Sequence, residues 1–112
     1  MTAAVAMEPT PAIDPSAAVR RVVELVAAAR ALPAAALLGA GRRPSHEACQ
    51  ARRTAMYLAA VALELPFHAV GRAFGCDRST VGVAVRAIED ERDDPSFDAW
   101  LNDLELLLGG ES

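Results

Sequence analysis

The sequence has 112 residues, a length that fits a single domain with a small core of its own. Alanine occurs 25 times and aromatic residues make up only 4% of the chain, which favours a helical bundle of small aliphatic side chains over a β-rich fold. The net charge of −4 at pH 7 argues against a protein that binds every polyanion indiscriminately.

The residue types exclude several kinds of chemistry. All eleven basic residues are arginines, so the sequence offers no phosphate-loop lysine and no Schiff-base lysine. Cys49 and Cys76 stand apart from any CxxC or histidine pattern, which indicates neither a disulfide framework nor a zinc site. The longest apolar run, residues 55–63, is too short to span a bilayer. We therefore expect a soluble cytoplasmic protein with reduced thiols, no cofactor, no metal and no membrane partner.

The net charge hides an asymmetry along the chain. Between Arg42 and Arg86 there are seven arginines and three acidic residues, whereas from Glu89 to Ser112 nine acidic residues stand against the single Arg92. The basic charge is therefore concentrated in the middle of the chain, and the C-terminal part is strongly acidic.

The N-terminal part divides into a tail and a first helix. Residues 1–13 contain two prolines and no apolar periodicity, which predicts a disordered tail. Asp14 and Pro15 are typical of an N-cap followed by the first helical residue, and they open a single helical domain predicted over residues 14–109. Valines at helical spacing form the inner face of this first helix, which should end before Pro33: Val19, Val22, Val23 and Val26.

The middle of the chain predicts a short helical turn over residues 33–38, then a basic loop over residues 39–44 that is bounded by glycines. Ser45 is a plausible N-cap for a long helix that extends to about Glu64. The inner face of this helix is expected to consist of Ala48, Ala55, Leu58, Ala59 and Ala62.

Residues 65–90 predict a helix-turn-helix. Pro66 begins its first helix and Gly75 ends that helix, in a left-handed conformation. Asp77 then caps a second helix that opens with polar residue types suited to contacts with bases. The inner stripe of this second helix consists of Val81, Ala84, Val85 and Ile88.

Asp94 and Pro95 repeat the opening signal of the first helix and predict a C-terminal amphipathic helix over residues 95–108, followed by Gly109. Its apolar stripe is interpreted as core and consists of Phe97, Trp100, Leu101, Leu104 and Leu108. The opposite face is acidic and leaves open a second interpretation, a helix that binds a partner, through Asp98, Asn102, Asp103 and Glu105.

Several short motifs then point to one family. They are Ala55-Met56-Tyr57-Leu58-Ala59, Leu65, Gly71-Arg72-Ala73-Phe74-Gly75, Asp77 with Thr80-Val81, and Ile88-Glu89. In sequence and spacing these motifs resemble the C-terminal DNA-binding domain of the bacterial replication initiator DnaA. The resemblance covers roughly residues 13–108 and is strongest over residues 52–89. It implies an all-α helix-turn-helix domain that binds an initiator box in double-stranded DNA.

The resemblance also implies a set of DNA-binding residues. The start of the recognition helix would enter the major groove, and an arginine of the preceding basic loop would enter the minor groove. The residues at matching positions are Asp77, Arg78, Ser79 and Thr80 for the major groove, Arg42 and Arg43 in the loop, and Arg52 and Arg53 at the start of the long helix. The chain departs from the family at Arg78, where members carry histidine, and at Cys76, where the turn is one residue shorter.

Side-chain chemistry independently supports DNA contacts at these positions. Arg78 can donate a bidentate pair of hydrogen bonds to guanine, and the hydroxyls of Ser79 and Thr80 suit phosphates or base edges. Asp77 can accept from a cytosine amine, although its position also suits a helix cap. A loop arginine is attracted to the negative potential of a narrow minor groove, but Arg42 and Arg43 are equally compatible with a solvated loop.

Two functions remain open from the sequence. The first is a DNA-binding regulator of replication initiation, or of genes near initiator boxes, associated with the nucleoid. The alternative keeps the initiator-like fold but binds a replication-control protein, which the acidic C-terminal part favours. An enzyme is not indicated, since no nucleophile, base or metal cluster occurs at a credible spacing. The chain also lacks the nucleotide-hydrolysing module of full-length initiators, so we expect no nucleotide partner.

Overall fold

The computed structural model describes residues 15–39 and 45–109, and this part of the chain is helical without any strand. In chain order the elements are α1 (Pro15–Arg30), α2 (Ala34–Leu37), α3 (His46–Tyr57), the π-helical segment η2 (Leu58–Ala62), α4 (Phe67–Phe74), α5 (Arg78–Glu91) and α6 (Pro95–Gly109). The predicted all-α fold with a helix-turn-helix is confirmed. The predicted N-terminal tail, the cap at Asp14, and the loop residues Arg42 and Arg43 lie outside the described residues.

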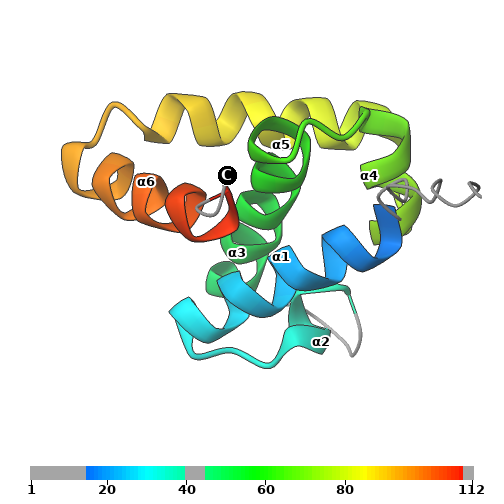
Figure 1. The fold of residues 1–112 in the computed structure, drawn as a ribbon, viewed down its shortest axis with the longest axis horizontal. Helices are drawn as coiled ribbons and strands as arrows, with labels where there is room; N and C mark the ends of the chain where they lie inside the picture. Colours follow the sequence, from blue (N-terminus) through cyan, green and yellow to red (C-terminus); the bar gives the residue numbers. More distant parts are fainter. Residues whose placement is uncertain (1–14, 40–44, 110–112) are drawn as a thin grey trace, which may run out of the picture.

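Helix α3 forms the centre of the bundle (Figure 1), with α1 on one side and α5 along the opposite edge. Helix α4 lies at one end of the molecule, and α6 lies at the other end beneath the C-terminal half of α5. The valine stripe of α1 and the predicted stripe of α5 are buried in one continuous core. The core is therefore built mainly from Ala, Val and Leu, as the composition predicts.

Helix α1 ends in a left-handed residue that is not glycine. Ala31 has a φ of 57°, its N–H donates to the Ala28 carbonyl at 3.2 Å, and the N–H of Leu32 donates to the Ala27 carbonyl at 2.9 Å. This pair of bonds satisfies carbonyls that the end of a helix leaves open. The chain thus turns away two residues before Pro33, and α2 follows within the predicted range of 33–38.

The predicted long helix begins as expected, because the Ser45 side chain accepts a bond from the N–H of Ala48 at 3.0 Å. Its second half differs from a regular helix. The N–H of Leu63 donates to the carbonyl of Leu58, five residues earlier, and Glu64 then turns left-handed with a φ of 58°. A hydrogen-bonded π turn contains one more residue than an α-helical turn. The turn begins at Leu58, which is fully buried.

Helix α6 begins at the predicted Asp-Pro signal, because Asp94 accepts bonds from both the N–H and the hydroxyl of Ser96. These bonds, first the hydroxyl and then the amide, lower the pKa of Asp94 below its ordinary range. In the apolar stripe, Leu101, Leu104 and Leu108 are buried. Phe97 and Trp100 are only half-buried, and the guanidinium of Arg30 lies 4.3 Å from the Trp100 ring centre.

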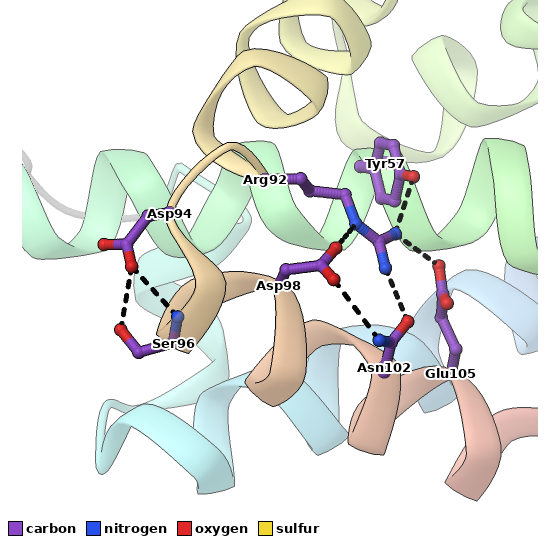
Figure 2. Close-up of polar contacts among 7 residues, drawn as sticks. All are labelled: Tyr57, Arg92, Asp94, Ser96, Asp98, Asn102 and Glu105. Atoms are coloured by element: carbon purple, nitrogen blue, oxygen red, sulfur yellow. Dashed lines mark hydrogen bonds and ion pairs between the residues drawn. The ribbon is translucent and has the colours of Figure 1, made fainter.

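Arg92, in the turn before α6, bonds much of the polar face of that helix (Figure 2). Its guanidinium donates to Asp98, to Asn102 at 2.6 Å and to Glu105 at 3.0 Å, and also to the hydroxyl of Tyr57 at 2.9 Å. Partial burial lowers the pKa of Arg92, but the bonds to Asp98, Glu105 and Tyr57 outweigh burial and raise that pKa above its ordinary value. Arg92 thereby joins α6 to α3 and to the end of α5.

Among the helices of the described residues, none is both long enough and apolar enough to cross a membrane.

Candidate nucleic-acid interface

The turn between α4 and α5 is held by backbone bonds. Gly75 is left-handed, with a φ of 74°, and its N–H donates to the carbonyl of Arg72 at 3.3 Å. The N–H of Cys76 reaches back to the carbonyl of Gly71 at 2.8 Å. These two bonds form a Schellman motif, which ends α4 at the predicted glycine.

The two buried glycines of α4 and α5 differ in how tightly they are packed. A Cβ on Gly71 would lie 2.7 Å from the carbonyl oxygen of Cys76, so the turn leaves no room for a side chain there. On the other helix, a Cβ on Gly82 would lie in ordinary contact, 3.6 Å from the Phe67 ring, which covers this face of α5. Together with the buried stripe of α5, these contacts fix which face of the helix is turned to solvent.

The exposed start of α5 carries the predicted major-groove residues. Asp77, Arg78, Ser79 and Thr80 are all exposed, and Asp77 occupies the N-cap position. The Asp77 side chain makes no cap bond to the helix backbone; it accepts a 2.7 Å bond from the Ser79 hydroxyl instead. That bond is the main cause of a pKa for Asp77 below its ordinary value. The four residues therefore form one polar surface at the helix start.

Arg52 and Arg53 are neighbours in sequence with different environments. The guanidinium of Arg52 donates to the Leu37 carbonyl at 3.0 Å and to the Phe74 carbonyl at 3.1 Å, and it lies 5.4 Å from the Phe74 ring centre. Arg52 thus joins the end of α2, where the basic loop departs, to the end of α4. Arg53 is exposed, and no ion pair or hydrogen bond of its side chain occurs within the described residues.

A shallow depression of about 280 Å³ lies where α3 meets the first half of α5. The two helices contribute its lining: Cys49, Arg52, Arg53 and Met56 from α3, and Thr80, Val83 and Ala84 from α5. The structure therefore brings Arg53 to the same surface as the start of α5. This proximity could not be derived from the sequence spacing of residues 53 and 80.

Sequence reasoning missed two exposed residues of α5 that share a solvent face with Ser79. Val83 is 59% exposed and Arg86 is exposed. The signal was present, because positions 83 and 86 follow Ser79 at helical spacings of four and seven residues. Further along, Glu89 and Asp90 are also exposed and give the end of α5 a negative charge. The exposed arginines of α5, Arg78 and Arg86, therefore lie before its acidic end.

Comparison with known proteins agrees with this geometry. The model of the bacterial DnaA protein helix-turn-helix matches residues 19–88, which begin within α1 and end within α5. No curated protein matches the sequence. The matched domain of DnaA is a DNA-binding domain rather than a catalytic one, and it binds double-stranded DNA. Because the match covers more than half of the chain, this protein belongs to the bacterial DnaA helix-turn-helix family.

Proposed function

We propose that this protein binds double-stranded DNA by placing the first two turns of α5 in the major groove. In this proposal it regulates replication initiation, or genes near initiator boxes, by occupying those sites. The observation that supports it most is the exposed polar surface Asp77–Thr80, carried by a helix whose opposite face is fixed in the core. Groove recognition requires such a rigidly presented helix start.

Each residue of the helix start has a proposed role. Arg78, whose side chain makes no ion pair within the described residues, donates to the acceptor edge of guanine. Ser79 and Thr80 contact a phosphate or a base edge through their hydroxyls. The Asp77 carboxylate accepts a hydrogen bond from the Ser79 hydroxyl and uses its remaining lone pairs to accept a second one from a cytosine amine.

The other arginines are proposed to act on the DNA backbone and the minor groove. Arg53 contacts a phosphate beside the major-groove surface, since it is exposed next to Thr80. Arg42 and Arg43 are proposed to reach the minor groove from the basic loop. Arg52 is proposed to position that loop relative to α4, since its donors already bond the Leu37 and Phe74 carbonyls.

The alternative function, binding of a replication-control protein, is favoured in the sequence by the acidic C-terminal part, to which the polar face of α6 belongs. Three of the four polar residues on that face, Asp98, Asn102 and Glu105, bond Arg92 within the fold. Their charges and dipoles therefore contribute to holding α6 in place. The acidic face of α6 therefore gives this alternative no advantage over DNA binding.

The test is binding of the full chain to a labelled duplex that contains an initiator box, compared with a scrambled duplex, over a salt series. We expect preference for the box and an affinity that falls with salt, with a log–log slope of about −0.9 for each phosphate contacted. Arg78→Ala should weaken binding to the box by about 1–3 kcal/mol and reduce the preference. Absence of binding to both duplexes at low salt contradicts the proposal.

Arg53→Ala and Arg20→Ala provide matched comparisons, because both residues are exposed arginines. Arg53→Ala should weaken binding to box and scrambled duplexes alike and reduce the salt slope by about 1. Arg20 lies on α1, away from the proposed surface, so Arg20→Ala should leave both affinities nearly unchanged. Equal losses from all three variants would indicate a nonspecific charge effect.

A further inference from the structure

Val83 is an exposed apolar residue in the middle of the proposed DNA-binding surface. It is 59% exposed, one turn beyond Thr80 on α5, while the neighbouring Gly82 and Ala84 are buried. Helix packing does not require an apolar side chain there, since Val83 points away from the core stripe. A β-branched residue also has lower helix propensity than alanine, so the helix itself gains nothing from it.

We propose that Val83 determines sequence preference by packing against the C5-methyl group of a thymine in the major groove. The proposal rests on the proposed function, because it places α5 in that groove. Thymine is the base whose major-groove edge carries a methyl group, and apolar side chains recognise it by direct contact. Val83 thus adds an apolar contact to the polar contacts of Arg78, Ser79 and Thr80.

The surroundings of Val83 fit this occupant. It forms part of the wall of the depression between α3 and α5, together with Met56 and Cys49. Arginines occupy the same lining, with Arg53 exposed. A lining that combines apolar side chains with an exposed arginine complements a methyl group that lies between two negatively charged phosphate backbones. The rigid χ1 of valine also holds its methyl groups in one place.

The experiment uses a duplex selected by the full chain from a random-sequence library. Each thymine of that duplex is replaced in turn by uracil, which removes the methyl group and keeps the base-pairing edge. Affinities are measured for the wild type, for Val83→Ala and for Leu106→Ala. Leu106 is the matched control because it is 68% exposed on α6, outside the depression.

At one thymine, uracil should weaken wild-type binding about threefold to fivefold, the effect expected for one lost methyl contact. The same replacement should change the affinity of Val83→Ala less than about 1.5-fold, whereas Leu106→Ala should behave as the wild type. Val83→Ala should remain folded, since alanine favours the helix, and circular dichroism checks this.

The outcomes separate the two proposals. If every uracil costs the wild type and Val83→Ala the same factor, Val83 contacts no thymine methyl and the inference is wrong although DNA binding stands. A uniform loss in Val83→Ala without dependence on uracil also overturns it and indicates packing against the backbone. If the library yields no bound duplex, the proposed function fails and the role of Val83 fails with it.

Discussion

At the scale of single residues, Arg52 and Arg53 illustrate how adjacent arginines differ in role. Arg52 donates to two backbone carbonyls, Leu37 and Phe74, and stacks near the Phe74 ring, whereas Arg53 has no such partner within the described residues. Arg52→Ala should therefore lower the free energy of unfolding by about 1–3 kcal/mol, because it leaves partly buried carbonyls unpaired. Arg53→Ala should change it by less than about 0.5 kcal/mol.

Urea denaturation followed by circular dichroism measures both values. Equal stability of the two variants would contradict the structural role of Arg52. At temperatures where both variants are folded, we expect Arg53→Ala to lose a phosphate contact, whereas Arg52→Ala should affect DNA binding only through the position of the basic loop. The sequence predicted a DNA-binding role for both arginines, because residue spacing does not show which backbone carbonyls a side chain will bond.

The Asp77 carboxylate offers a second test at this scale. The Ser79 hydroxyl holds the pKa of Asp77 below its ordinary value of 3.8. A lowered pKa means that the folded state favours the charged form, so the small stabilisation exists above the unfolded pKa and is lost as the pH falls through the folded pKa. In an NMR titration, Ser79→Ala should raise the pKa of Asp77 toward the ordinary value.

Asp94 provides the internal control, since its lowered pKa depends on Ser96 and should not move in Ser79→Ala. An unchanged pKa for Asp77 in this variant would show that the bond between Ser79 and Asp77 does not form in solution.

At the scale of elements, the ends of the helices differ in how well the sequence predicts them. Ser45, Gly75 and the Asp94-Pro95 pair are all strong end signals, and the structure uses each of them. The left-handed residues Ala31 and Glu64 have no such signal, because tertiary packing imposes their backbone conformation against a steric cost. For the same reason the π turn at Leu58 could not be predicted from apolar spacing alone.

The left-handed backbone conformation of Ala31 can be tested by substitution. Replacement by glycine removes the cost of the left-handed conformation, about 1–2 kcal/mol, and adds chain entropy to the unfolded state, about 0.4–1 kcal/mol. Ala31→Gly should therefore raise the free energy of unfolding by about 0.5–1 kcal/mol, measured by urea denaturation. Ala28→Gly, at an exposed position within α1, is the control and should lower stability by about 1 kcal/mol. A destabilised Ala31→Gly would contradict the observed end of α1.

Replacement of Arg92 tests how much its hydrogen bonds contribute to the stability of α6. Arg92→Met removes the bonds to Asp98, Asn102, Glu105 and Tyr57 and leaves two carboxylates without their cation. We expect a loss of about 1–2 kcal/mol in unfolding free energy, since the cluster is only partly buried. Hydrogen exchange should become faster in α6 than in α3. Unchanged exchange in α6 would show that its apolar stripe alone holds it.

At the scale of the whole molecule, the charge asymmetry of the sequence has a structural counterpart. Arg78 begins α5 and Arg53 shares a depression with Thr80, whereas the exposed acidic residues Glu89 and Asp90 lie at the end of the helix. An acidic helix end repels phosphate, so DNA would be accepted only along the first half of the helix. The sequence predicted the two charged regions, but only the fold shows that one helix joins them.

The fold and the helix-turn-helix could be predicted because apolar periodicity, proline and glycine are local signals. The surface around Val83 could not, because it combines residues of α3 and α5 that are 24 or more positions apart. Tertiary packing alone brings Arg53 and Met56 beside Thr80 and Val83. The start of α5 was predictable from the sequence, and the composition of the surface around it was not.

Recognition of DNA sequence by the start of α5 can be tested in a single comparison. Binding of wild type and Arg78→Ala is measured on an initiator-box duplex and a scrambled duplex at the same low salt. We expect the wild type to prefer the box and Arg78→Ala to lose most of this preference, while the affinity of the variant for the scrambled duplex changes much less. Equal affinity of the wild type for both duplexes, or a preference that survives Arg78→Ala unchanged, would contradict it.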